Sequence, residues 1–169
     1  MKKAIMMLAL LVIPFALQAQ TKFHDVEAKD ATGPVKSMTE NVMGRSQITT
    51  FSPEGKMQVE GMSDATYDAD GYIQSSKMTV QDMQVTVKYI WENGKVKAQT
   101  ISMMGQEMKA TRTFDEKGNP ATESMNMMGQ DITTSYKDYK FDSHGNWISR
   151  QASIMGQEME QTRTIEYYE

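Results

Sequence analysis

Met103-Met104-Gly105-Gln106-Glu107-Met108 is the stretch that decides the fold, because it recurs along the chain. Its copies are Met127-Met128-Gly129-Gln130-Asp131-Ile132 and Ile154-Met155-Gly156-Gln157-Glu158-Met159. Self-similarity of this kind is typical of a small structural unit that is copied and stacked. The sequence therefore predicts a repeat architecture in which each Met-Gly centre is a tight turn.

A second turn motif consists of an aromatic residue, a short polar run and a glycine. Asp commonly opens the run because its carboxylate accepts a hydrogen bond from the backbone two residues on, and Gly closes it because φ must be positive there. Asn-Gly is also a strong hairpin signal. The copies are Phe51-Ser52-Pro53-Glu54-Gly55, Tyr67-Asp68-Ala69-Asp70-Gly71, Phe114-Asp115-Glu116-Lys117-Gly118, Phe141-Asp142-Ser143-His144-Gly145 and the shortened Trp91-Glu92-Asn93-Gly94.

The two turn motifs alternate along the chain. Between them lie segments such as 84–91, in which Val85, Val87, Tyr89 and Trp91 have the period of two that indicates a strand with one buried face. The alternation predicts an all-β fold, an antiparallel up-and-down meander of about a dozen strands with one turn type at each end. The Met-Gly turns are expected at Gly44, Gly105, Gly129 and Gly156, with weaker versions near Gly61 and at Gln81-Asp82.

The apolar stripes of these strands are interrupted by polar residues such as Arg112, Gln161 and Arg163. A weakly amphipathic sheet of this kind favours a curved single sheet or a partly open barrel with a wet interior over a dense two-sheet sandwich. The Thr- and Lys-rich segment 133–140 does not supply the apolar band that an outer-membrane strand requires.

The N-terminal segment has the pattern of a secretory signal. Lys2 and Lys3 precede an apolar run from Ala4 to Leu17, and small residues at 16–19 suit cleavage before Gln20. We therefore expect a signal peptide at 1–19, a lead-in segment with one short helical turn at 20–34, and a β-hairpin repeat domain at 35–169. No second apolar run follows, which predicts an exported, soluble protein of the periplasm or the extracellular space without a transmembrane segment.

Composition narrows the possible partners and chemistry. The net charge is −4, and loss of Lys2 and Lys3 would make it more negative, which argues against nucleic acid as a partner. The chain has no cysteine, which excludes a lipid-modified N-terminal Cys, disulfides and thiolate chemistry. Every leucine lies in the signal segment, so the expected core uses Val, Ile, aromatic residues and Met.

Three of the aromatic-Asp-Gly turns resemble the YD or Rhs type of hairpin repeat, whose core is Tyr-Asp-x-x-Gly followed by Asn or Arg. The matching copies are Tyr67-Asp68 with Gly71, Phe114-Asp115 with Gly118-Asn119, and Phe141-Asp142 with Gly145-Asn146. The resemblance covers roughly the last two-thirds of the mature chain. It implies an envelope or surface hairpin array with a binding or structural role.

The methionines around the Met-Gly turns are the candidate metal ligands. Thioether sulfur is a soft ligand that suits Cu(I), and adjacent hairpins would place the clusters side by side at one end of the sheet. The alternative is that a chain without leucine uses Met as apolar filler. The candidates are Met103, Met104, Met108, Met127, Met128, Met155 and Met159.

The sequence predicts no enzyme. Its two histidines, His24 and His144, lie in no recognisable setting for nucleophilic catalysis, and no phosphate loop or zinc motif is present. The calcium-like Asp68-Ala69-Asp70-Gly71 lacks the carboxylate that an EF-hand needs six residues after its glycine. Two functions stay open. One is a non-enzymatic envelope protein with a binding or structural role, which meets an envelope protein, a glycan or an apolar ligand through its sheet face or Met-rich edge. The other is a periplasmic carrier of Cu(I) or of an apolar or lipid ligand.

Overall fold

The computed structural model describes residues 22–169 except residues 43 and 128, and the expected signal peptide lies outside these residues. The described chain forms one short helix, α1, and one sheet of twelve strands. The element bounds are α1 (Asp25–Ala28), β1 (Val35–Val42), β2 (Arg45–Phe51), β3 (Met57–Gln58), β4 (Met62–Tyr67), β5 (Ile73–Val80), β6 (Met83–Glu92), β7 (Lys95–Met103), β8 (Gln106–Phe114), β9 (Pro120–Met127), β10 (Gln130–Phe141), β11 (Trp147–Ile154) and β12 (Gln157–Tyr167).

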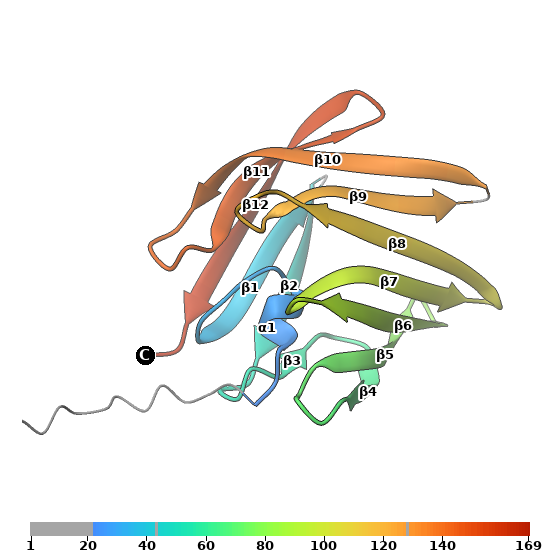
Figure 1. Ribbon diagram of the computed structural model, residues 1–169. Coiled ribbons are helices and arrows are strands. Elements are labelled where there is room, and N and C mark those ends of the chain that lie inside the picture. The colour runs from blue at the N-terminus through green and yellow to red at the C-terminus, as the bar shows by residue number, and fades with distance from the viewer. Residues whose placement is uncertain (1–21, 43, 128) are drawn as a thin grey trace, which may run out of the picture.

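The strands follow the order β3-β2-β1-β12-β11-β10-β9-β8-β7-β6-β5-β4, and each neighbouring pair is antiparallel. Only the pairing of β1 with β12 joins strands that are distant in the sequence, for example Met38 with Ile165. The sheet curls into a nearly closed barrel with one unsealed seam between its end strands, β3 and β4 (Figure 1). The prediction of an up-and-down meander that forms a partly open barrel is confirmed.

The two turn classes lie at opposite ends of the sheet, as predicted. We name these the Met-Gly end and the Asp-Gly end. At the Met-Gly end, the β7–β8 turn has φ of 51° at Met104 and 78° at Gly105, as expected of a tight two-residue hairpin turn. At the Asp-Gly end, Asp115 Oδ1 accepts hydrogen bonds from the backbone N–H groups of Lys117 and Asn119 at 2.9 and 2.8 Å. The side chains of Asp68 and Asp142 accept equivalent pairs of backbone hydrogen bonds.

Register shifts near the Asp-Gly end bend the sheet. In the β10–β11 pair the register shifts between Lys137 and Lys140, where Asp138 has a φ of 55°, and the β6–β7 and β8–β9 pairs shift close to the same end. An extra residue in one strand increases local twist and curvature. These irregularities therefore help the sheet to curl around the N-terminal segment.

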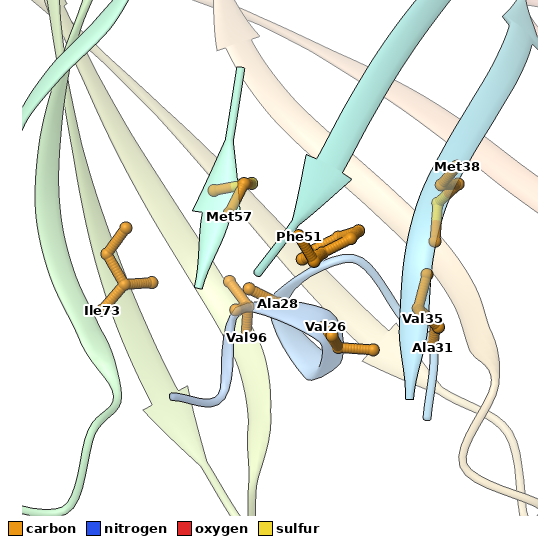
Figure 2. Close-up of a cluster of buried hydrophobic side chains, with 9 residues drawn as sticks. All are labelled: Val26, Ala28, Ala31, Val35, Met38, Phe51, Met57, Ile73 and Val96. Atoms are coloured by element: carbon orange, nitrogen blue, oxygen red, sulfur yellow. The ribbon is translucent and has the colours of Figure 1, made fainter. Parts of the chain in front are cut away.

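The hydrophobic core is concentrated around α1. Val26, Ala28 and Ala31 come from the lead-in segment and are at most 4 % exposed. Figure 2 shows them among side chains from strands on both sides of the seam. These strand residues are Val35, Met38, Phe51, Met57, Ile73 and Val96. The core does use Val, Ile, Phe and Met as expected, but the lead-in segment is part of it.

Candidate functional site

The lead-in segment spans the seam at the Asp-Gly end. The backbone N–H of Phe23 donates to Glu54 O in the β2–β3 turn, and that of His24 donates to Gly71 O in the β4–β5 turn, both at 3.1 Å. These two turns belong to opposite sides of the seam. Figure 1 shows α1 within the curve of the sheet, close to β1 and β7. The lead-in therefore covers one end of the barrel and connects the two edges that no ladder joins.

Asp25 makes the same connection with its side chain. It is fully buried, and its Oδ2 accepts hydrogen bonds from the Met57 backbone N–H in β3 and from the Tyr67 hydroxyl in β4, both at 2.8 Å. Its Oδ1 is buried without a hydrogen-bond partner among the described residues. Burial raises the pKa of this carboxyl above the ordinary 3.8, although the hydrogen bonds from Met57 and Tyr67 oppose the shift. One carboxyl thus connects both edge strands.

We expect Asp25→Ala to lower the free energy of unfolding by about 1–3 kcal/mol, because two buried donors lose their acceptor. The cost should depend on pH. Since the folded pKa of Asp25 is raised, the stabilisation linked to its protonation is complete below the unfolded pKa and is lost as the pH rises through the folded pKa. Urea titrations between about pH 4 and pH 7 should therefore show a smaller cost at the higher pH. The exposed Asp70 provides the control variant Asp70→Asn, and a cost of Asp25→Ala that does not vary with pH would contradict the expectation.

Two interior arginines hold the lead-in from the other side. Arg163 is 3 % exposed and donates from Nη1 to Lys29 O at 2.8 Å, from Nη2 to Asp30 O at 2.7 Å, and from Nε to Trp147 O at 2.5 Å. Desolvation lowers its pKa to about 10, although the Glu40 carboxylate at 4.0 Å opposes the shift. Arg163 therefore satisfies three carbonyl groups, two of which belong to the lead-in.

Arg112 forms the second connection, through carboxylates. Its Nη1 lies 3.4 Å from the Asp30 carboxylate of the lead-in, and its Nε lies 2.6 Å from Glu123 in β9. Desolvation acts to lower the pKa of Arg112, but the two carboxylates outweigh it and the net shift is upward. Arg112 and Arg163, which interrupt the apolar stripes of their strands, thus bind the lead-in segment.

A cavity of 140 Å³ lies inside the barrel next to the lead-in. Its lining falls into two chemical groups. Both charged residues of the lining, Lys29 and Arg112, are cations, and they are accompanied by the polar Gln47, Tyr89 and Gln99. The rest of the lining is apolar and consists of Ala28, Met57, Val59, Met62 and Met78. A cavity with mixed lining of this kind is suited to a ligand that has both a polar and an apolar part.

A groove of 270 Å³ follows the seam and is continuous in its lining with the cavity. The groove is bordered by residues of β3 and β4 and of the segment that joins them. Met57, Val59 and Met62 line both the groove and the inner cavity. These three residues form the wall between the cavity and the groove. Two of them are methionines, whose side chains are flexible.

The predicted metal ligands within the described residues lie on three hairpins that follow one another in the sheet order, as expected. Met104 and Met155 stand at the tips of separate hairpins and are 82 % and 85 % exposed. The pairing Ile101↔Met108 and Met103↔Gln106 places Met103 and Met108 on one face, whereas Met159 pairs with Ala152 across the β11–β12 hairpin. Met127 pairs with Gln130, and Met128 lies outside the described residues.

The methionines that line the cavity could not be recognised from the sequence. Met57, Met62 and Met78 are not among the predicted metal ligands, and they come together only because β3, β4 and β5 meet beside the seam. The two histidines take structural positions: His24 stacks on Tyr72 at 4.0 Å between ring centroids, and His144 stacks on Tyr167 at 3.8 Å. Within residues 22–169, apart from 43 and 128, no group of three or more His, Cys, Asp or Glu residues is placed to hold a metal ion.

No protein-family model and no curated protein matches the chain. The geometry of the cavity and the seam is therefore the basis for a functional proposal.

Proposed function

We propose that this protein is an exported, non-enzymatic binding protein of the cell envelope, periplasmic or extracellular, which takes up a small apolar or amphipathic ligand in its inner cavity. The observation that carries the proposal is the mixed lining of that cavity, apolar beside the seam and polar beside the lead-in. Flexible Met side chains adapt to ligands of differing shape, which favours binding over a rigid structural role. In the described part of the chain, no helix has the length and apolar character that a membrane span requires.

The size of the cavity supports a small ligand or a small part of a larger one. At 140 Å³ it is close to the engineered apolar cavity of about 150 Å³ that binds benzene. A longer ligand would have to extend past Met57, Val59 and Met62 into the seam groove. The cavity and the groove together therefore form the proposed binding site.

Val59 allows a direct test, because it lines both spaces and lies outside the regular strands. We expect the mature protein to bind the neutral apolar probe N-phenyl-1-naphthylamine, measured by probe fluorescence. Val59→Trp should weaken binding by about tenfold or more, since an indole fills the shared wall. Val80 is 46 % exposed and far along β5, so Val80→Trp is the matched control and should bind as the wild type does.

Circular dichroism and the urea midpoint would establish that both tryptophan variants are folded. Absence of probe binding by the wild type would contradict the proposed function, as would equal affinity of a folded Val59→Trp. Native mass spectrometry of protein purified from the envelope provides a second readout. A co-purified ligand that is lost in Val59→Trp and kept in Val80→Trp is the expected result.

Cu(I) binding is the second candidate, and the observation in its favour is that three thioethers, of Met57, Met62 and Met78, line one cavity. The charge of Lys29 weighs against it, because a cation in the lining repels another cation. A competition titration with Cu(I) distinguishes the two functions. Tight binding that is lost in Met62→Leu and Met78→Leu would favour the metal.

A further inference from the structure

We infer that the ligand is a single-chain amphiphile with an anionic head, which lies beside Lys29 while its apolar chain runs through the seam between β3 and β4. The inference rests on the proposed binding function and specifies the class of ligand. It follows from three observations: the charges of the cavity lining, the ion pairing of the cations there, and the shared wall between cavity and groove.

The charges of the lining favour an anion. Ten residues line the cavity, and the charged ones are Lys29 and Arg112. No carboxylate is among the ten. Charge complementarity in a partly enclosed site selects a ligand of opposite sign, and the effect is larger there than in bulk water.

The two cations differ in their existing partners. Arg112 already has Asp30 and Glu123 within ion-pair distance, and this network holds the lead-in. Lys29 has no carboxylate within 4.0 Å in residues 22–169 outside positions 43 and 128. Its backbone carbonyl accepts a hydrogen bond from Arg163, which fixes the backbone of Lys29 beside the cavity, while its side chain stays outside the ion-pair network of Arg112. Lys29 is therefore the residue assigned to the anionic head.

The apolar chain of the ligand lies in the groove at the seam. The cavity has room only for the head and a short part of the chain. The adjoining groove offers the chain the apolar Met57, Val59, Met62 and Ala65, and its other lining residues are Lys56, Gln58, Ser63 and Asp64. β3 and β4 share no ladder in the described part of the chain, so displacement of the Met side chains opens the wall without breaking a strand pairing. The two spaces, of 140 and 270 Å³, suit a single acyl chain, whereas a two-chain lipid exceeds their combined volume.

The test compares ligands with the same twelve-carbon chain and different heads: dodecanoate, dodecyl phosphate and dodecanol. Each competes with N-phenyl-1-naphthylamine for the mature wild-type protein at neutral pH and low salt, below the critical micelle concentration. We expect both anions to bind at least about tenfold more tightly than the alcohol. A preference between carboxylate and phosphate then identifies the head.

Lys29→Gln should reduce this preference to less than about threefold. Lys109→Gln is the matched control, since Lys109 is exposed on β8 and does not line the cavity. Equal affinities for dodecanol and the anions, or a preference that survives Lys29→Gln, would overturn the inference and leave the proposed function standing. Failure of all three ligands and of the neutral probe to bind would overturn both.

Discussion

Arg163→Ala should be the most destabilising single substitution among those considered, with a loss of about 3–5 kcal/mol in the free energy of unfolding. The side chain is 3 % exposed, and its removal leaves the carbonyl oxygens of Lys29, Asp30 and Trp147 without these donors. Buried acceptors without a partner bear their full cost of desolvation. Glu40 would also lose the cation 4.0 Å away.

Urea unfolding of the mature protein measures this effect, with Arg45→Ala as the control because Arg45 is exposed at the start of β2. The control should change the unfolding free energy by less than about 0.5 kcal/mol. The loss in Arg163→Ala should be accompanied by faster tryptic cleavage after Lys29, since two of the lost contacts hold the lead-in. A stability close to that of the wild type would show that Arg163 does not hold this segment.

Gly71→Ala should cost more than Gly94→Ala, by about 1–3 kcal/mol. Both glycines have positive φ, +90° and +72°, so the backbone strain of an alanine is common to the two variants. They differ in the space around them. A Cβ on Gly71 would lie 2.0 Å from the carbonyl oxygen of Lys22 in the lead-in, whereas a Cβ on Gly94 meets no atom within 4 Å.

The difference between the two variants therefore isolates the contact between the lead-in and the β4–β5 turn. Differential scanning calorimetry of both proteins gives the comparison, and His24 should lose its hydrogen bond to Gly71 O only in Gly71→Ala. Equal melting temperatures would mean that the lead-in moves away from Gly71 without cost. A larger loss in Gly94→Ala would contradict the described packing.

The fold could be predicted from the sequence because its turns are local. The carboxylate of Asp115 bonds the backbone two and four residues on, and the Asn93-Gly94 dipeptide adopts positive φ by itself, so each turn is encoded where it occurs. Alternation of the two turn classes then gives the strand order, except for one pairing. The closure of β1 against β12 and the bulge at Asp138 depend on contacts across the sheet, and no local pattern indicates them.

The candidate site could be predicted only in part. The polar interruptions at Arg112 and Arg163 indicated a wet interior, but their partner, the lead-in segment, lies far away in the sequence. Asp25 is one acidic residue in a polar stretch, and only the folded chain shows that it joins two edge strands. The repeated Met-Gly motif indicates the candidate metal ligands, whereas no sequence pattern sets apart the methionines that line the cavity, Met57, Met62 and Met78.

The pairing of β1 with β12 also determines the order in which parts of the fold can form during synthesis. A ribosome makes the lead-in long before Arg163, so the lead-in cannot be held in place until the strand that anchors it has been made. Hairpins such as β5–β6 and β7–β8 need only their own neighbours and can form while the chain is still growing. The pairing of β1 with β12 closes the longest loop, so it has the largest entropic cost and is expected to form last. A chain that ends before β12 would therefore form most of its hairpins but lack Arg163, which holds the lead-in beside the cavity.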